Sequence, residues 1–302
     1  MIIVGGGPAA ISAGIYAVRK ELKTLLIAQD WGGQLNWTNL IENYPGFESI
    51  TGPELVKKLV AHLKKYQGED LEIRERSEIK KIEAEKEQLV KVEADKVYQA
   101  KALILATGRN YKKLGIPGEK EFSSKGVSYC VTCDGPIFKD KKVAVIGGGN
   151  AGLEAALDLL DYASKIYLLE FLPQLTADEY LQKMVRKNSK INILTNVAVQ
   201  EIKGEQFVNG LVYQERDSQK EKEITLEGVF VGIGTRANSS PVKNVVELNQ
   251  EGEVKIDEKN RTSVRNIFAA GDVTDVSHKQ IVVAAGEGVK AALNVYQYLC
   301  RK

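Results

Sequence analysis

Cysteine and histidine are scarce in this 302-residue chain, which has three cysteines and two histidines. Secreted disulfide scaffolds carry many more cysteines, so that class of protein is excluded. A structural zinc site needs four Cys or His ligands. Only Cys130 and Cys133 are close in the sequence, whereas Cys300, His62 and His278 are remote. We therefore expect no metal site.

Long hydrophobic runs and an excess of one charge are also missing. The formal net charge is +2, and both signs are spread along the chain, whereas a nucleic-acid-binding protein needs a clustered basic face. No run reaches the roughly 18 apolar residues of a membrane helix. The apolar run Met1–Val4 begins at the first residue, which leaves no room for a signal peptide. We therefore expect a cytoplasmic protein with no nucleic-acid or membrane partner.

Glycine, in contrast, is plentiful and gathers in two similar motifs, Gly5–Ala10 and Gly147–Gly152. Each follows a short apolar run and precedes a helix-like stretch. In a dinucleotide site the first glycine makes the turn, the second lets the backbone approach the pyrophosphate, and the third lets the helix pack against the strand. One such motif can be a plain turn, but two in this context favour dinucleotide binding. The candidate binding positions are Gly5, Gly7, Pro8, Ala10, Gly147, Gly149, Asn150 and Gly152.

The surroundings of the two motifs repeat one plan. Each motif opens a strand–turn–helix–strand segment, which leads into a charged meander of short strands and then into a buried strand. Those buried strands end at Thr107-Gly108 and at Gly234. The repetition indicates an internal duplication and an α/β protein with two Rossmann-like dinucleotide-binding domains.

The C-terminal part of the chain breaks this repeat. A buried strand runs into Gly271-Asp272, and residues 280–300 are expected to form a long helix. If this segment completes the first domain, the second domain is an insertion. We therefore expect one domain from residues 1–113 and 244–302, and an inserted domain from residues 114–243. Cys300, in the apolar tail, is expected to be a packing residue.

The second strand of a dinucleotide unit indicates which nucleotide binds. An acidic residue at its end binds the ribose hydroxyls of NAD, whereas a basic pocket accepts the 2′-phosphate of NADP. In the second unit this strand ends at Glu170 and is followed by Phe171 and Leu172. The next basic residue is Lys183, and no arginine is expected nearby. The second site is therefore predicted to prefer NADH.

A pair of cysteines lies just before the second motif, in the segment Cys130-Val131-Thr132-Cys133-Asp134. An isolated CxxC in an intracellular protein favours thiol–disulfide chemistry, and its spacing brings two sulfurs close enough to bridge. The first thiol, at a helix N-terminus, is expected to be the exposed nucleophile and the second to be more enclosed. Asp134 could pass protons as the sulfurs change state, or it could be only the N-cap of the following segment.

These motifs occur in the same order in low-molecular-weight thioredoxin reductase, which the chain resembles over nearly its whole length. Besides the glycine motifs, the shared pieces include Gly33-Gln34-Leu35, Glu42-Asn43-Tyr44-Pro45-Gly46, Cys130–Gly135 and Gly271-Asp272-Val273. The resemblance implies the fold of the class II pyridine nucleotide-disulfide oxidoreductases, in which an FAD domain is split in sequence and an NAD(P)H domain is inserted. It also implies a homodimer.

The resemblance also assigns roles to residues. Cys133 would meet the flavin, Cys130 would attack the disulfide of a partner, and Asp134 would donate and accept the proton. Gly5, Gly7 and Ala10 would hold the FAD pyrophosphate. The other candidate cofactor-binding residues are Gly32, Gly33, Gln34, Asn43, Thr107, Gly108, Gly234, Gly271, Asp272, Lys279, Gln280 and Ile281.

One departure from that family concerns the nucleotide. Thioredoxin reductases usually carry a His-Arg-Arg run where this chain has Glu170-Phe171-Leu172. The segment from Leu168 to Asp178 is similar instead to the NADH-dependent flavoprotein subunit of alkyl hydroperoxide reductase, as is Gly286-Glu287-Gly288. That subunit carries an additional N-terminal redox module that is not found here. A thioredoxin-like module is therefore expected to be a separate protein.

The sequence thus predicts an FAD-containing disulfide reductase that takes electrons from NADH, with NADPH less favoured. Its partner would be a thioredoxin- or glutaredoxin-like protein. Because the dithiol and the nicotinamide would both belong to the inserted domain, that domain is expected to swing about its two linkers. Two alternatives stay open: an NADH oxidase or peroxiredoxin-linked reductase, and a redox-sensing flavoprotein without catalysis.

Overall fold

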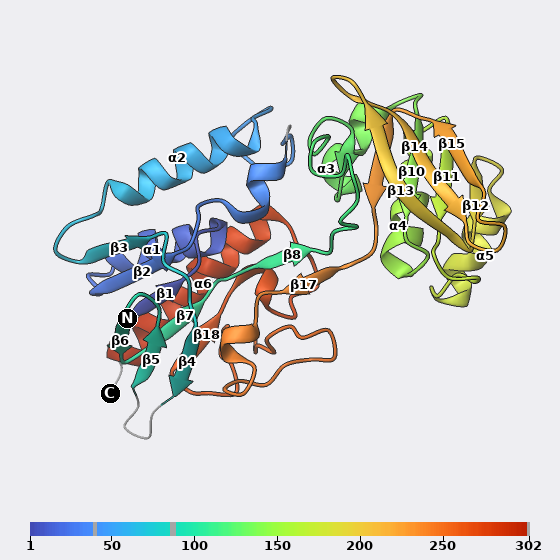
Figure 1. Ribbon diagram of the computed structural model, residues 1–302. Coiled ribbons are helices and arrows are strands. Elements are labelled where there is room, and N and C mark those ends of the chain that lie inside the picture. The colour runs from blue at the N-terminus through green and yellow to red at the C-terminus, as the bar shows by residue number, and fades with distance from the viewer. Residues whose placement is uncertain (39–40, 85–88, 301–302) are drawn as a thin grey trace. The chain divides into compact units, whose positions relative to one another are not determined.

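The computed structural model describes residues 1–38, 41–84 and 89–300, and the chain divides into two compact units (Figure 1). Unit 1 contains Met1–Asn36, Glu42–Asn110 and Arg236–Lys302, and unit 2 contains Trp37–Ile41 and Tyr111–Thr235. Most of unit 2 is therefore inserted between two parts of unit 1. Both units contain a parallel sheet, so the α/β fold class expected from the sequence is confirmed.

The centre of unit 1 is a five-stranded parallel sheet in the order β18-β7-β1-β2-β3. Its strands are β1 (Ile2–Val4), β2 (Thr24–Ala28), β3 (Leu71–Glu75), β7 (Leu103–Leu105) and β18 (Ile267–Ala269). β1, β7 and β18 are apolar and buried along their whole length, as in a parallel sheet that is covered on both faces. Because β18 pairs with β7, the C-terminal part of the chain completes this sheet.

Unit 1 contains the helices α1 (Pro8–Val18), α2 (Gly52–Lys64) and α6 (Ile281–Cys300). Small buried residues let α1 and α6 approach closely. They are Ala9 in α1 and Gly288 and Ala292 in α6. A β-carbon on Gly288 would lie 2.0 Å from the carbonyl oxygen of Ala9. At the start of α2, Thr51 and Glu54 form a capping box that satisfies free backbone amides.

The first charged meander divides between two sheets. Leu71–Glu75 joins the parallel sheet as β3, whereas the later strands form a three-stranded antiparallel sheet. These strands are β4 (Lys81–Ala84), β5 (Val90–Glu93) and β6 (Val97–Ala100). Ile82, Val90 and Val92 are buried in the same core cluster as Leu103, which gives β4 and β5 one apolar and one charged face.

Unit 2 repeats the architecture with a five-stranded parallel sheet in the order β12-β11-β10-β16-β9. Its strands are β9 (Val127–Ser128), β10 (Lys142–Ile146), β11 (Lys165–Leu169), β12 (Ile191–Leu194) and β16 (Gly228–Val231). Its helices are α3 (Val131–Asp134), α4 (Asn150–Asp158) and α5 (Glu179–Lys187). The second charged meander forms the antiparallel strands β13 (Val197–Gly204), β14 (Val208–Glu215) and β15 (Glu221–Thr225).

The two connections between the units pair with each other as a two-stranded sheet, β8 (Arg109–Tyr111) with β17 (Thr235–Ala237). Beyond β17, the Asn238 amide donates to the Gly108 carbonyl (2.9 Å), and the Thr107 hydroxyl donates to the Asn238 carbonyl (2.8 Å). Val242 is fully buried in a core cluster of unit 1. Residues 236–243 therefore pack with unit 1, whereas the boundary drawn from the sequence follows residue 243.

Five short 3₁₀ helices complete the described elements. They are η1 (Gly33–Trp37), η2 (Gly135–Phe138), η3 (Leu159–Asp161), η4 (Ser240–Val242) and η5 (Gly271–Val273). Cys300 is exposed at the end of α6, so the expectation that it packs in a core is wrong. The last buried residue of that helix is Val295, and the final turn extends past the core.

None of the helices in the described part of the chain is both long enough and apolar enough to cross a membrane.

Candidate functional site

The two glycine motifs form equivalent turns, one between β1 and α1 and the other between β10 and α4. Gly5 has a φ of +131°, and a β-carbon on it would lie 2.1 Å from the Ala106 carbonyl oxygen. Gly147 has a φ of +124°, and its β-carbon would lie 2.6 Å from the Gly232 carbonyl oxygen. Both positions therefore require glycine. Each turn leads directly into a helix N-terminus, which attracts phosphate through free amides and the helix dipole.

The second and third positions of the glycine motifs differ in the space around them. A β-carbon on Gly7 would meet nothing within 4 Å, and one on Gly149 would have its nearest contact at 3.6 Å. Protein packing does not explain these glycines, and the open space would let a pyrophosphate approach the backbone. Ala10 is fully buried, and a β-carbon on Gly152 would lie 1.9 Å from the Gly147 carbonyl oxygen. The third position thus packs the helix against the turn.

The loop residues expected near the flavin are joined to other parts of unit 1. Gln34 in η1 donates through Nε2 to the Arg109 carbonyl at 2.7 Å. Asn43 donates through Nδ2 to Gln280 Oε1 at 3.4 Å, and Gln280 lies one residue before the start of α6. Gly32 precedes η1 and has a φ of +88°; a β-carbon there would lie 2.4 Å from Val56. These bonds hold Gln34 beside Arg109 and Asn43 beside the start of α6.

Asp272, in η5 just after β18, carries the clearest sign of an additional ligand in unit 1. Its Oδ1 atom is buried and has no hydrogen-bond partner among the described residues. Burial raises the pKa of this carboxyl, which the positive charges of Lys279 and Arg109 counteract only in part. A buried oxygen without a donor is costly. The site therefore fits a cofactor that brings a hydroxyl donor, as the ribityl chain of FAD does.

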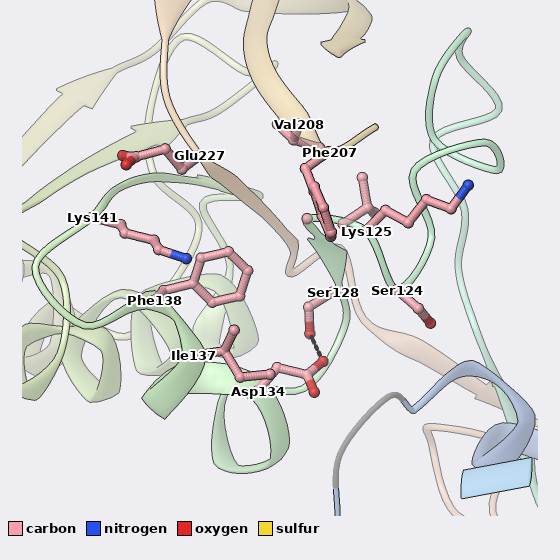
Figure 2. A pocket seen from close by; sticks show the side chains of 12 residues that line it. Ser124, Lys125, Ser128, Asp134, Ile137, Phe138, Lys141, Phe207, Val208 and Glu227 are labelled. Carbon is pink, nitrogen blue, oxygen red and sulfur yellow. Dashed lines mark hydrogen bonds between the residues drawn. The ribbon is translucent and has the colours of Figure 1, made fainter. Parts of the chain in front are cut away.

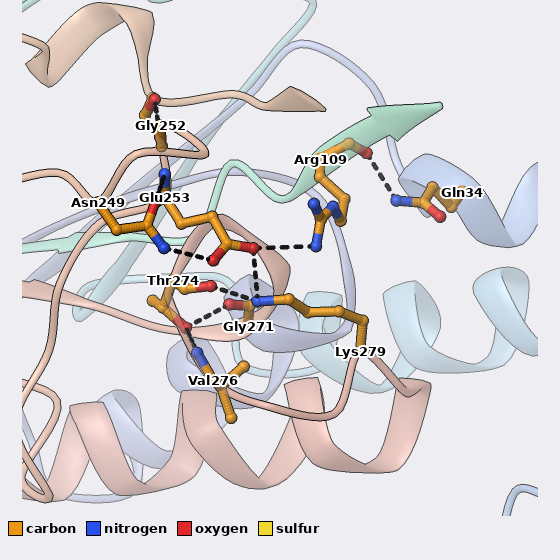
Figure 3. A network of polar contacts seen from close by, with 10 residues as sticks. Gln34, Arg109, Asn249, Gly252, Glu253, Gly271, Thr274, Val276 and Lys279 are labelled. Carbon is orange, nitrogen blue, oxygen red and sulfur yellow. Dashed lines mark hydrogen bonds and ion pairs between the residues drawn. The ribbon is translucent and has the colours of Figure 1, made fainter. Parts of the chain in front are cut away.

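Glu253 accepts bonds from three donors and forms a network in unit 1 (Figure 3). Arg109 and Lys279 each reach its Oε1 at 3.1 Å, and Asn249 donates to its Oε2 at 2.8 Å. Burial alone would raise the pKa of Glu253, but the bonds from Asn249 and Lys279 outweigh it and lower the pKa. Lys279 also donates to the Thr274 carbonyl. The network therefore holds Lys279 in place.

Thr107, Gly108 and Gly234 lie where the connections leave the two units. Thr107 and Gly108 bond to Asn238, as described above, and Gly108 has a φ of +67°. Gly234 has a φ of +88° and precedes β17, and its carbonyl accepts a bond from the Lys112 amide at 3.0 Å. The structure thus places these three candidates at the linkers.

Glu170 follows β11 and is almost fully buried. Its Oε2 accepts a bond from the Gly148 amide, and its Oε1 accepts one from the Leu172 amide at 2.7 Å. The carboxylate therefore ties the second glycine turn to the segment after β11. A carboxylate has acceptor capacity beyond these two bonds, so it can also bind a ribose hydroxyl. Its charge lies beside the turn that would hold the dinucleotide.

The expectation that no arginine lies near this strand end is wrong. The Arg216 guanidinium carbon lies 4.0 Å from the ring centre of Phe171. Arg216 also donates to the Phe171 carbonyl at 3.1 Å and to Asn196 Oδ1 at 3.2 Å. Arg216 follows β14 and is 45 residues from Phe171 in the chain, so no local motif signals the contact. Antiparallel pairing of β13 and β14 brings Arg216 to this position, which the sequence does not reveal.

The CxxC segment forms one helical turn that is closed by a disulfide. Cys130 is the N-cap of α3, and the Cys133 amide donates to Cys130 Sγ at 3.2 Å. The two sulfurs are bonded, with the Cα atoms 5.3 Å apart. Both cysteines are half-buried. The amide that points at Cys130 Sγ is suited to stabilise a thiolate there.

Asp134 lies next to Cys133 and is bound by Ser128 (Figure 2). The Ser128 hydroxyl donates to Asp134 Oδ2 at 2.6 Å. Asp134 precedes η2, but its side chain makes no capping hydrogen bond, which disfavours the interpretation of it as a simple N-cap. Burial raises the pKa of Asp134, and the bond from Ser128 lowers it in part. A carboxyl with a raised pKa can carry a proton at higher pH than an ordinary aspartate.

Two parallel-sheet units with equivalent glycine turns, one of which also carries a disulfide, define a class of dinucleotide-dependent disulfide oxidoreductases. The chain belongs to the pyridine nucleotide-disulphide oxidoreductase family, whose family model matches residues 1–288. Membership of this family implies FAD and a nicotinamide cofactor. The two glycine turns fit these groups, as does the Asp272 oxygen that has no partner among the described residues.

Among curated relatives, the chain is 42% identical to the NADH dehydrogenase of Bacillus subtilis over 301 residues. It is 43% identical over 303 residues to a subunit of the alkyl hydroperoxide reductase of Pseudomonas aeruginosa. Both matches cover all of this chain but only 58% of those proteins. Among solved structures, the thioredoxin reductase of Streptococcus pyogenes matches with a TM-score of 0.93 at 36% identity, covering 99% of this chain and 97% of that one. The Lactococcus lactis thioredoxin reductase matches with 0.66 at 34% identity, covering 100% and 99%.

Proposed function

We propose that this protein is a flavin-dependent disulfide reductase. Electrons would pass from NADH through FAD and the Cys130–Cys133 disulfide to a thioredoxin- or glutaredoxin-like protein. The observation that carries the proposal is the disulfide itself, which lies in the same unit as the second glycine turn; Asp134 directly follows Cys133 in the chain. A cytoplasmic location, where NADH is available, and a homodimer, which the resemblance suggests, complete the proposal.

FAD, when bound to unit 1, supplies a two-electron carrier between the nicotinamide and the disulfide. Gly5, Gly7 and Ala10 would hold its pyrophosphate at the N-terminus of α1, and Asp272 would accept a hydroxyl. This role would give the buried Oδ1 atom the partner that it lacks in the described part of the protein. The other residues proposed for this site are Pro8, Gly32, Gly33, Gln34, Asn43, Thr107, Gly108, Gly271, Lys279, Gln280 and Ile281.

Unit 2 would bind the nicotinamide dinucleotide at its own glycine turn, with NADH preferred to NADPH. Glu170 supports this preference because its negative charge lies beside the turn and opposes a 2′-phosphate. The positive charge of Arg216, which is stacked on Phe171, would offset part of this repulsion of a 2′-phosphate. We therefore propose a moderate preference for NADH. The remaining residues proposed for this site are Gly147, Gly149, Asn150, Gly152 and Gly234.

The two sulfurs would have different tasks. Cys130 Sγ accepts the Cys133 amide, which favours a thiolate at Cys130 after reduction. We propose that this thiolate attacks a partner disulfide and forms a mixed disulfide, from which Cys133 releases the reduced partner. Cys133 would be the sulfur that meets the flavin, as the resemblance implies. Asp134 would supply the proton that one sulfur needs.

The proposal requires unit 2 to move. The disulfide and the second glycine turn both belong to unit 2, whereas the FAD site belongs to unit 1, and both must reach one flavin. Unit 2 would present them in turn by moving about the two linkers. The two solved relatives cover nearly all of this chain at similar identity, yet their TM-scores are 0.93 and 0.66. Domain movement within the family would produce such a difference.

A second candidate function is direct oxidation of NADH, without a role for the disulfide. The name of the Bacillus subtilis relative, NADH dehydrogenase, favours it. In that case the cysteines would be dispensable for turnover.

The Cys133→Ser variant decides between the two functions. We expect purified wild-type protein with FAD to reduce an aromatic disulfide reagent with NADH, and the variant to lose this activity while NADH oxidation persists. With a disulfide-bonded thioredoxin-like protein, the variant should form a stable mixed disulfide at Cys130, visible by mass spectrometry. Equal disulfide reduction by both proteins would contradict the proposal.

A further inference from the structure

Ser128 links the proton-carrying carboxyl to the backbone of the first redox cysteine. Its hydroxyl oxygen lies 2.6 Å from Asp134 Oδ2 and 3.1 Å from the Cys130 amide nitrogen. Figure 2 shows the Ser128–Asp134 bond at one side of a pocket. The Ser128 side chain is only 4% exposed, so water does not compete freely for the hydroxyl. One buried side chain thus connects both groups.

The direction of these bonds determines where the transferable proton lies. Ser128 accepts from the Cys130 amide and has one proton to donate. Its two acceptors are Asp134 Oδ2 at 2.6 Å and the Cys130 carbonyl at 3.3 Å, and the shorter distance is typical of a bond to a carboxylate. With Oδ2 engaged, a proton taken up by Asp134 goes to Oδ1, which is buried and has no partner in the described part of the chain.

A pocket lies beside this pair. Its volume is about 350 Å³, and Ser128 and Asp134 line it together with apolar side chains such as Phe138 and Phe207. It is therefore large enough for several water molecules. The charged side chains that line it are Lys125, Lys141 and Glu227. All of these residues belong to unit 2, so the pocket does not depend on unit 1.

We propose that Ser128 is a positioning residue that holds the Asp134 carboxyl for proton transfer to the redox sulfurs. The inference rests on the proposed function. In the step concerned, two electrons enter the Cys130–Cys133 bond, which breaks. One sulfur takes the proton from Asp134 and becomes a thiol, and the other stays a thiolate. The Asp134 carboxylate then takes a proton from water.

Ser128→Ala tests the link without depending on turnover. The carbonyl band of protonated Asp134 is followed by infrared difference spectroscopy during a pH titration of the oxidised protein without nucleotide, and Asp134→Asn identifies the band. Because the Ser128 hydroxyl lowers the pKa of Asp134, its removal should raise the midpoint of the titration. Ser128→Thr, which keeps a hydroxyl, should restore the wild-type midpoint.

Turnover supplies the second readout. Asp134 donates in its protonated form, so the alkaline limb of the disulfide-reduction rate should move to higher pH in Ser128→Ala by the same amount. The plateau rate should fall about tenfold because the carboxyl is less well held. Ser239→Ala is the matched control, since Ser239 is also a buried serine, and its hydroxyl donates at 2.6 Å to the Gly252 carbonyl in unit 1. It should shift neither the midpoint nor the limb.

An unchanged Asp134 titration in Ser128→Ala, or equal rate losses in Ser128→Ala and Ser239→Ala, would overturn the inference. If the wild-type protein reduces no disulfide with NADH while the infrared midpoint still moves, the proposed function fails and the Ser128–Asp134 link is supported. The two failures are therefore distinguishable.

Discussion

At the scale of a single residue, Glu170 holds a turn together and is proposed to select the nucleotide. Its oxygens tie the Gly148 amide to the Leu172 amide, and its charge lies beside the turn that is proposed to hold the dinucleotide. The backbone bonds make the carboxylate part of the turn, and burial makes the bonds stable. A change at this residue is therefore expected to affect both the turn and the choice of nucleotide.

Glu170→Gln should reduce the ratio of kcat/KM for NADH to that for NADPH about tenfold, because a neutral amide no longer repels a 2′-phosphate. The amide oxygen can replace only one of the two acceptors, so the Tm should fall by a few degrees. Steady-state kinetics with both nucleotides and thermal unfolding measure these effects. The control is Glu179→Gln, which removes an exposed carboxylate on α5. If Glu170→Gln left the NADH-to-NADPH ratio of kcat/KM unchanged, the charge of Glu170 would have no role in the choice of nucleotide.

Arg216 should favour NADPH, whereas Glu170 should favour NADH. Its guanidinium is fixed by Phe171 and Asn196 and lies beside the end of β11. We expect Arg216→Gln to lower kcat/KM for NADPH about fivefold and for NADH by less, because a positive charge near a 2′-phosphate is removed. Arg216→Lys keeps the charge and should lose less. An equal loss with both nucleotides would show that Arg216 only holds the turn.

At the scale of elements, the contact between α1 and α6 closes unit 1. α1 follows the first glycine turn, and α6 follows the segment that contains Asp272 and Lys279. A β-carbon on Gly288 would lie 2.0 Å from the Ala9 carbonyl oxygen, whereas one on Gly286 would meet nothing within 4 Å. The helix contact therefore requires glycine at position 288 but not at position 286.

Gly288→Ala should lower the free energy of unfolding by about 2 kcal/mol or more, because α6 must move away from α1. Gly286→Ala should raise it by up to about 1 kcal/mol, because alanine favours the helix and has room there. Urea unfolding of the protein without cofactor measures both. If both substitutions changed the free energy of unfolding in the same direction, the close contact between α1 and α6 would not explain the effect of Gly288→Ala.

The elements show what the sequence could and could not predict. The glycine turns and the CxxC could be found because each is encoded by a few consecutive residues with fixed spacing. Arg216 with Phe171, and Arg109 with Glu253, could not, because strand pairing and loop packing join residues that are 45 and 144 positions apart. Ser128 was missed for a different reason, since a lone serine before a CxxC has no signature until its partners are known.

At the scale of the whole molecule, the account depends on two linkers. β8 and β17 pair beside each other, and Gly108 and Gly234 adopt positive φ angles at the linker segments. Two adjacent connections allow one unit to rotate while its own core stays intact. Turnover would then include a movement of unit 2 between two half-reactions.

If that movement limits turnover, kcat should fall roughly in proportion to the relative viscosity of the solvent. Sucrose and a polymer of equal osmolarity but lower microviscosity separate viscosity from other solvent effects. Asp134→Asn should slow the chemistry until it becomes limiting, and the viscosity dependence should then disappear. A wild-type kcat that is independent of viscosity would show that movement is not limiting.

The most direct test of the central claim is an anaerobic titration of the FAD-loaded protein with NADH. The disulfide is a two-electron couple, so wild-type protein should consume one more equivalent of NADH per flavin than Cys133→Ser before free NADH accumulates. Cys300→Ser, which removes the exposed thiol at the end of α6, should behave like the wild type. If wild type and Cys133→Ser consume equal amounts, electrons do not reach the Cys130–Cys133 disulfide, and the account is wrong.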